Sequence, residues 1–376
     1  MGPRSHPLLR CFMRRHRYVP ARRVALRWAL LCGAPIAAAG NARAQGCMPV
    51  RFTSPNLNGK DNSYLNDHGW QLGVGYRWLH ADRFYVGHAY EPGLSPGAKP
   101  IEITDHTLNL SATYAFTNHF SVELDVPFEA NRESFIQGDG LRHGSSSTSM
   151  GDISVVGNVW LLQPLDHANG NVSLSLGVKA PTGSTDKTGA FYTSSSSTVT
   201  VPDNNTIQSG DGGWGIVLQT SAFRRLAGRL SAYAAGDYLV SPKSHTNVPA
   251  PAVLGGALTG VTDEYSAHAG LGFALAPKRG ISVSLGGRID GVPVHDLVGG
   301  GDQYFRRPGY TIYAEPALSL TFAKSPFSRL GSTLSLSVPV ALDQNREASV
   351  GEQRSGTHYG GNFARYLIFL NYSIRP

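Results

Sequence analysis

Hydrophobic and polar residues alternate along most of the chain after residue 69. In Trp70–Trp78 the even positions are Trp, Leu, Val, Tyr and Trp, whereas the odd positions are Gln, Gly, Gly and Arg. Because successive side chains of a β-strand point to opposite faces, this segment predicts a strand with one apolar face and one polar or small face. The same alternation fills Thr107–Phe116 and, after Thr117-Asn118, residues 120–128, so these two segments predict a hairpin.

Nine further segments follow the same pattern and bring the expected total to twelve strands of 9 to 13 residues. They are residues 152–162, 172–180, 214–223, 229–240, 264–275, 281–291, 310–322, 332–342 and 363–374. The pattern leaves open which face of 214–223 and which face of 229–240 is the apolar one. No sustained helical periodicity, linker or change of composition divides the chain, so we expect a single all-β domain over residues 70–376.

Strand length separates two all-β architectures, a soluble β-sandwich and a membrane barrel. Sandwich strands usually have about 5–6 residues, whereas a tilted membrane-spanning strand needs about 9–11. The connections also alternate, as do the short periplasmic turns and long extracellular loops of outer-membrane barrels. The short ones are 117–118, 163–171, 224–228, 276–280 and 323–331, and the long ones are 79–106, 129–151, 181–213, 241–263, 292–309 and 343–362. We therefore predict a transmembrane antiparallel up-and-down β-barrel of the outer-membrane type, with about twelve strands and both termini in the periplasm, because a closed sheet leaves no unpaired edge in lipid.

Aromatic residues on the apolar faces fall at the expected strand ends. On the turn side they are Trp70, Phe116, Phe120, Phe322 and Tyr372, and on the loop side they are Trp78, Phe128, Trp214, Tyr265 and Tyr310. Outer-membrane barrels carry two such girdles because amphipathic rings settle at both membrane interfaces. These positions support a membrane barrel independently of strand length.

Charge changes this picture only at the amino-terminal end. The 376 residues include 33 Lys and Arg against 26 Asp and Glu, a formal net charge of +7. Nine of the arginines and no acid lie in residues 1–44, which leaves 24 basic and 26 acidic residues in the rest of the chain. A nucleic-acid partner therefore loses its main support. The arginine-rich start, the apolar run 28–39 and Ala42-Arg43-Ala44 predict instead a signal peptide over residues 1–44.

Residues 45–69 contain no convincing strand and are rich in Asn, Pro and Ser. We expect this segment either to lie in the periplasm or to fold into the barrel lumen as a plug. Cys47 is the one cysteine after the signal peptide, so no internal disulfide is expected. The Cys and His residues lack the spacing of a zinc site, and we expect neither a metal nor a cofactor.

Four short motifs resemble one family of outer-membrane proteins. They are Gln45–Arg51 (QGCMPVR), Gly151–Gly157 (GDISVVG), Lys179–Gly183 (KAPTG) and Gly210–Ile216 (GDGGWGI). In these motifs the chain is similar to the transporter-like family named for the MetA pathway of phenol degradation. The resemblance covers most of residues 45–376 and implies a barrel that passes small hydrophobic or aromatic compounds, without implying particular binding residues. Barrels of this type often end in an aromatic residue that the barrel-assembly machinery recognises, whereas this chain ends Ile374-Arg375-Pro376; we still expect that machinery and outer-membrane lipid as partners.

Two motifs point to enzymes, and neither has the context that it needs. Gly210–Gly215 matches G-x-G-x-x-G, but a Ser/Thr-rich loop precedes it and a strand follows, whereas a dinucleotide site lies between a strand and a helix. His119 and Ser121 have the spacing of an outer-membrane lipid hydrolase with a serine nucleophile. The Asn-Gly expected after that serine is replaced by Val122-Glu123, so we expect no enzyme.

The polar faces of the strands identify the residues expected inside the barrel. The charged candidates for lining the lumen are Arg77, Glu123, Asp125, Asp152, Lys179, Asp237, Arg288, Asp290, Glu315 and Asp343. They form either a water-filled path whose charges select solutes or a set of ion pairs that fills a narrow lumen. Phe223, Tyr233, Tyr313 and Phe369 add an apolar stripe to such a path or serve as filler.

The sequence therefore favours a channel or transporter for small molecules in the outer membrane of a Gram-negative cell. Two alternatives stay open: a lipid-modifying hydrolase and a non-conducting structural or adhesive barrel.

Overall fold

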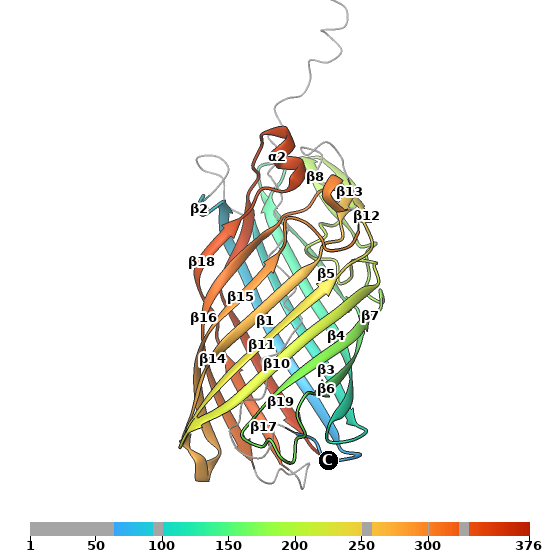
Figure 1. Ribbon diagram of the computed structural model, residues 1–376. Coiled ribbons are helices and arrows are strands. Elements are labelled where there is room, and N and C mark those ends of the chain that lie inside the picture. Colours follow the sequence, from blue (N-terminus) through green and yellow to red (C-terminus); the bar gives the residue numbers. More distant parts are fainter. Residues whose placement is uncertain (1–63, 93–100, 250–257, 300, 323–330) are drawn as a thin grey trace, which may run out of the picture. The chain divides into compact units, whose positions relative to one another are not determined.

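The computed structural model describes residues 64–92, 101–249, 258–299, 301–322 and 331–376. These residues form a closed antiparallel β-barrel, with short turns at one end and long connections at the other (Figure 1). We call these the turn end and the loop end. In the described part of the chain no helix is both long and apolar enough to cross a membrane. The predicted signal peptide, residues 1–44, lies outside the described residues.

Twelve strand positions make up the described barrel wall, which confirms the predicted architecture and number. Ten are single strands: β1 (Trp70–Val86), β3 (Glu102–Ala115), β4 (Phe120–Ile136), β7 (Gly170–Lys179), β10 (Gly215–Ala227), β11 (Leu230–Val240), β14 (Glu264–Ala276), β15 (Ile281–Val292), β16 (Gly309–Phe322) and β19 (Gly361–Ile374). Two are divided: β5 (Arg142–Met150) precedes β6 (Ser154–Trp160), and β17 (Ser332–Ser337) precedes β18 (Val340–Arg346). The barrel closes where β1 pairs with β19, from Leu72 opposite Ile374 to Tyr85 opposite Gly361.

Short elements complete the two ends. The loop end carries β2 (Ala89–Tyr90), β8 (Thr188–Ser194), β9 (Ser197–Pro202), β12 (His245–Pro249), β13 (Leu258–Gly260), a 3-10 turn η3 (Gly301–Gln303) and the helix α2 (Val350–Ser355). A second 3-10 turn, η2 (Pro277–Arg279), joins β14 to β15 at the turn end. It closes at Gly280, whose φ of 69° and close approach to the Thr321 carbonyl favour glycine.

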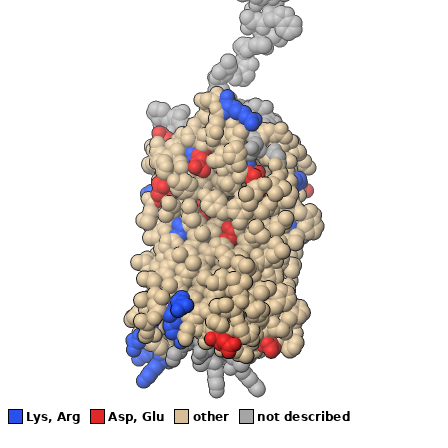
Figure 2. Space-filling view, viewed as in Figure 1, with Lys and Arg blue, Asp and Glu red and all other residues tan. Residues whose placement is uncertain are grey.

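The alternation in sequence becomes two faces of the wall. Outward leucines are strongly exposed, as Leu176 (64%) and Leu285 (63%) illustrate, whereas inward neighbours such as Lys179 (1%) are buried. The structure also settles the two ambiguous strands, because Val217 in β10 and Tyr233 in β11 point inward and are 2% and 6% exposed. On the face seen in Figure 2, charged side chains gather toward the two ends and the wall between them carries few.

Most of the predicted aromatic positions lie on this outer surface near the strand ends. Trp70, Phe116 and Phe322 are exposed at the turn end, and Trp214 is exposed just before β10 at the loop end. Phe128 is also exposed but lies halfway along β4. Rings stack along each girdle; the centroids of Phe116 and Phe120, for example, are 5.5 Å apart. This is the distribution that two membrane interfaces require.

Several strands extend further toward the loop end than the sequence predicts. Residues 79–86, 102–106, 129–136 and 142–150 belong to β1, β3, β4 and β5, so the prediction of loops over 79–106 and 129–151 is wrong there. Glu129 and Asn131 face inward, while Ala130 and Arg132 are exposed. In 129–136 and 142–150 both faces are largely polar, whereas in 79–86 and 102–106 the apolar side chains, such as Leu79 and Ile103, face inward. The hydrophobic alternation of the spanning part therefore does not continue into these extensions.

A β-bulge in β18 changes which residues face the lumen. Ile312 pairs with Asp343 and Tyr313 pairs with Ala341, which leaves Leu342 without a partner in the ladder. The Asp343 side chain is 42% exposed and lies 3.0 Å from Nδ1 of His88. The prediction that Asp343 lines the lumen is therefore wrong, because one extra residue shifts the alternation by one position.

Candidate functional site

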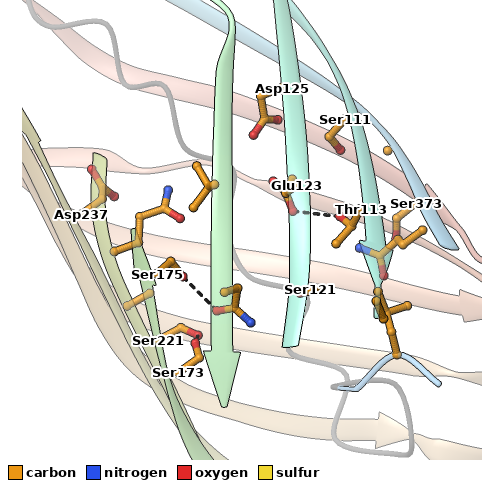
Figure 3. A pocket seen from close by; sticks show the side chains of 18 of the residues that line it. Ser111, Thr113, Ser121, Glu123, Asp125, Ser173, Ser175, Ser221, Asp237 and Ser373 are labelled. Atoms are coloured by element: carbon orange, nitrogen blue, oxygen red, sulfur yellow. Dashed lines mark hydrogen bonds between the residues drawn. The ribbon is translucent and has the colours of Figure 1, made fainter. Parts of the chain in front are cut away.

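The lumen near the turn end contains a cavity of about 330 Å³, which we call the chamber (Figure 3). Strands from most of the barrel circumference line it with small hydroxyl side chains. Six of these are Ser111, Thr113, Ser121, Ser173, Ser175 and Ser221. Some bond to each other across strands, as Ser173 Oγ and Ser221 Oγ do at 2.7 Å. A hydroxyl both donates and accepts hydrogen bonds, so this wall suits water and polar solutes.

Three predicted carboxylates line the chamber from β4 and β11 (Figure 3). Glu123 accepts a hydrogen bond from Thr113 at 2.9 Å, Asp125 from Asn109 at 2.8 Å and Asp237 from Ser266 at 3.0 Å. Among the described residues, none of the three carboxylates forms an ion pair with a Lys, Arg or His. Arg288 and Arg375 also line the chamber, and Asp237 lies within electrostatic range of Arg288. The three carboxylates therefore leave the chamber with an excess of acidic over basic side chains.

The charged lumen residues nearer the loop end are paired. Lys179 donates to Asp152 at 2.8 Å and to Asp211 at 2.6 Å, and its side chain is 2% exposed. Arg77 donates to Asp105 across β1 and β3. We call these pairs, together with the group around Arg288, the ion-pair belt.

The third part of the belt lies on β14, β15 and β16. Arg288 donates from Nε to Asp290 at 2.9 Å, and its Nη1 lies 3.7 Å from Glu315. His268 lies 3.0 Å from Glu315, which also accepts a hydrogen bond from Ser337 at 2.8 Å. The belt fills part of the cross-section with paired charges, whereas the chamber below it is open. The two interiors that the sequence left as alternatives therefore occur at different depths of the same lumen.

A segment of the connection between β9 and β10 folds into the barrel, and we call residues 203–212 the inward loop. Ile207 is 0% exposed, and Asn204 donates to Glu133 of β4 at 3.0 Å. Asp211 bonds Lys179 and thereby joins the inward loop to the belt. The loop narrows the lumen between the chamber and the loop end.

Glycines allow this loop to approach its neighbour closely. A Cβ atom on Gly210 would lie 2.6 Å from the backbone of Gly183, far inside van der Waals contact. Both glycines belong to motifs that the sequence singled out, KAPTG and GDGGWGI. The G-x-G-x-x-G match therefore serves the packing of two backbone segments and is followed by β10 rather than by a helix.

A second cavity of about 110 Å³ lies between the belt and the loop end. Its lining mixes apolar residues such as Leu79, Ile103 and Phe363 with charged ones such as Arg77 and Asp105. It adjoins an apolar cluster inside the wall. Of the four aromatics predicted to face inward, Tyr233, Tyr313 and Phe369 are buried, at 6%, 2% and 2% exposure. Phe223 lies near the turn end, where its ring centroid is 5.9 Å from that of Trp160.

Residues 64–69 lie at the mouth of the turn end. Tyr64 donates its hydroxyl to the His167 carbonyl at 2.8 Å, and its own carbonyl accepts from Arg375 at 3.0 Å. Burial raises the pKa of the Tyr64 phenol. The chain therefore connects the β6–β7 turn with the residue that follows β19 before it enters β1. Residues 45–63, the larger part of the segment predicted as a plug, lie outside the described residues.

The sequence found nine of the inward charges and missed several of their partners. Arg77, Glu123, Asp125, Asp152, Lys179, Asp237, Arg288, Asp290 and Glu315 all point into the lumen. The missed partners are Asp105, Asp211 and His268, and the sequence also missed Arg346, which pairs with Glu352. Asp105 lies in an extension of β3, Asp211 in the inward loop and Arg346 beyond the bulge, where alternation gave no signal. His268 follows the alternation of β14 and could have been found from it.

The residues weighed for hydrolysis are not arranged as a nucleophile and its base. Ser121 lines the chamber, and Nδ1 of His119 is buried without a hydrogen-bond partner in the described structure. Among the described residues, no group of three or more His, Cys, Asp or Glu is placed to hold a metal ion.

Comparison with known proteins identifies the fold. No family model and no curated protein matches the sequence. An outer membrane channel from Pseudomonas putida F1 has a similar crystal structure, with a TM-score of 0.58 and 15% identity over 86% of this chain and 100% of that one. A Pseudomonas aeruginosa FadL homologue has a TM-score of 0.41 and 11% identity over 90% of this chain and 97% of its own. The CymD monoaromatic hydrocarbon channel has a TM-score of 0.39 and 9% identity over 82% of this chain and 88% of its own. At 15% identity, the similarity to the Pseudomonas putida channel shows the fold alone, that of an outer-membrane β-barrel.

Proposed function

We propose that this barrel is an outer-membrane channel through which small hydrophilic solutes pass passively, with neutral and cationic solutes preferred over anions. The observation that carries the proposal is the chamber, whose hydroxyl lining is combined with three carboxylates that form no direct ion pair among the described residues and that outnumber the two arginines of the lining. An excess of one sign of charge along a channel raises the local concentration of oppositely charged solutes.

The outer surface supports a location in a membrane. Leu176, Leu285 and Leu342 are between 63% and 70% exposed, and many other outward positions are large and apolar. A contiguous apolar surface of this kind is unfavourable in water and suits hydrocarbon. The predicted signal peptide supplies the export that such a location requires.

The size of the lumen limits the solute. The chamber is near the lower end of typical small-molecule sites, which span about 300–1,000 Å³. The inward loop and the belt narrow the path further toward the loop end. We therefore assign the channel to solutes of about the size of an amino acid or a monosaccharide.

Ion selectivity tests the charge preference. In planar bilayers under a KCl gradient, the wild type should give a reversal potential that favours K⁺, and the variant E123Q/D125N/D237N should lose much of that preference. The matched control is Asp343→Asn, which removes a carboxylate from the outer side of the wall and should leave the reversal potential unchanged. Anion selectivity in the wild type would contradict the charge preference, and a complete lack of conductance would favour a structural or adhesive barrel.

A second candidate function is the passage of small aromatic or otherwise hydrophobic compounds, which the resemblance to the MetA-pathway family implies. The cavity of about 110 Å³ favours it, because Leu79, Ile103 and Phe363 supply apolar surface there. Liposomes that contain the protein should then take up phenol faster than a sugar of similar size, and Ile103→Asn should slow phenol more than the sugar. Equal effects of this substitution on both solutes would argue against the second candidate.

A further inference from the structure

Basic side chains gather on two neighbouring turns at the turn end. Arg224, Arg225 and Arg229 come from the end of β10 and the β10–β11 turn, and Lys278 and Arg279 come from η2. All five side chains are exposed. We call this group the basic patch. Figure 2 shows Lys and Arg side chains at the lower corner of the barrel, over the ends of these strands.

The two turns that carry the basic patch lie side by side. Strand β11 pairs with β14, with Leu230 opposite Phe273. The N–H of Ala274 also donates to the carbonyl of Arg229 at 3.0 Å, which joins the β10–β11 turn directly to the end of β14. The bases of both turns therefore form one surface.

No acid of either turn neutralises the basic patch. Residues 224–230 and 276–280 contain no Asp or Glu. In the described structure Arg224, Arg229, Lys278 and Arg279 form no ion pair, and Arg225 donates to the Asn169 side chain at 3.1 Å. The patch keeps a large positive charge at the surface, where it attracts anions.

The basic patch adjoins the apolar outer wall without an intervening polar zone. Leu226 is 51% exposed between the arginines, and Leu271 (50%) and Leu275 (54%) lead up the neighbouring strand. Arg224 follows the outward positions Ile216 and Leu218 of β10, so its side chain belongs to the outer surface rather than to the lumen. Solute attraction into the chamber therefore does not account for it.

We propose that the basic patch binds the phosphate headgroups of anionic phospholipids in the periplasmic leaflet. Phospholipid has both features that this surface needs: acyl chains for the leucines and a phosphate for the bases. Guanidinium groups pair with phosphate through two parallel hydrogen bonds, and ammonium groups add a point charge. The proposal goes beyond solute passage; it rests on the membrane location given above and is independent of conduction.

Native mass spectrometry of the full chain in detergent micelles tests this proposal, with dioleoylphosphatidylglycerol and dioleoylphosphatidylcholine as the two probe lipids. The wild type should retain phosphatidylglycerol much more strongly than phosphatidylcholine. Arg224→Gln/Lys278→Gln removes one base from each turn and should weaken phosphatidylglycerol binding about 25-fold, since each base near an anionic surface contributes on the order of a five-fold change. The charge-matched control Arg354→Gln/Lys243→Gln removes two exposed bases from the loop end and should leave that binding unchanged.

Three results would overturn the proposal. They are equal binding of the two lipids, equal losses in the two double variants, and displacement of phosphatidylglycerol by inorganic phosphate at a similar concentration, which would indicate a site for free anions. If Arg224→Gln/Lys278→Gln does not fold, the salt dependence of the wild type decides instead. Raising NaCl from 50 to 500 mM should weaken phosphatidylglycerol binding and spare phosphatidylcholine, and an unchanged preference would refute the electrostatic basis. A protein that binds lipid in this way but does not conduct would refute only the proposed channel.

Discussion

Replacing Lys179 with methionine should release the inward loop from the barrel wall and widen the lumen. The Lys179 ammonium joins Asp152, two residues before β6, to Asp211 of the inward loop. The side chains of Asp152 and Asp211 are 0% and 16% exposed. Methionine fills a similar volume without the charge. The substitution leaves two carboxylates close together after removing the cation that they share.

The magnitude follows from the burial of this group. Breaking a buried ion pair by removing one partner costs about 3–5 kcal/mol, and the partial exposure of Asp211 places the effect near the lower end of that range. The barrel can relieve most of this cost by letting Asp211 move into water. Since about 1.4 kcal/mol corresponds to a tenfold change in an equilibrium, a cost of about 3 kcal/mol shifts the balance between docked and released loop on the order of 100-fold. The contact of Asn204 with Glu133 still holds the other end of the loop.

Single-channel recording measures this shift. Lys179→Met should show a larger unitary conductance than the wild type, or frequent transitions to a larger level. The control is Lys243→Met, because Lys243 also touches the inward loop, through the Gly212 carbonyl at 2.8 Å, but is exposed. This control should behave as the wild type does.

Unchanged conductance in a folded Lys179→Met protein would refute the role of the inward loop as a constriction. Folding is checked by the shift of the barrel between heated and unheated samples in SDS gels. A Lys243→Met protein with the same increase would show that the loop responds to any nearby loss of charge, and would refute the specific role of the buried pair.

Three other predictions concern the outer wall, a loop-end helix and the amino-terminal segment. Leu285→Lys should lower the free energy of unfolding in lipid vesicles, measured by urea titration, by about 2–4 kcal/mol. Leu297→Lys, at a loop position of similar exposure, should change the free energy of unfolding by less than about 0.5 kcal/mol. Equal effects of the two substitutions would argue against a membrane-spanning wall at Leu285. Burial alone would raise the pKa of Glu352, but the Arg346 guanidinium and backbone N–H groups lower this pKa overall. Hydrogen-exchange protection of α2 should therefore be complete above the ordinary pKa of a glutamate, about 4.3, and be lost as the pH falls through the lower pKa that Glu352 has in the folded protein. Glu352→Gln should remove that pH dependence, and a loss of protection already at pH 6 would contradict this assignment. Deleting residues 48–66 should raise single-channel conductance, and unchanged conductance would show that this segment is not a plug.

The sequence predicted the barrel well because lipid forces a simple code on the spanning part of each strand. Positions such as Leu174, Leu176 and Val178 must be apolar, while Ser173 and Ser175 face water, so every second residue reports its face. The code also supplied nine inward charges, since a charge within such a segment has only one acceptable side.

The alternation of apolar and polar residues is confined to the membrane-spanning part of each strand. The strand extensions at 129–136 and 142–150 are polar on both faces, and nothing in their sequence distinguishes a strand from a loop. A bulge such as the one at Leu342 shifts the register by one residue, and the local sequence of β18 does not predict this bulge. The pairing of Lys179 with Asp211 depends on a long connection folding back into the lumen, which periodicity does not describe.

The seam between β1 and β19 has a consequence for how the molecule is made. Its hydrogen bonds join the first and last strands of the barrel, so Leu72 pairs with Ile374, from which it is separated by most of the chain. Forming contacts over such a span is slow, because the loop between them has to be closed first. Until β19 pairs with β1, the sheet has two unpaired edges, and each edge can form hydrogen bonds with a strand of another chain. The protein is therefore most vulnerable to mispairing just before its last strand joins the sheet.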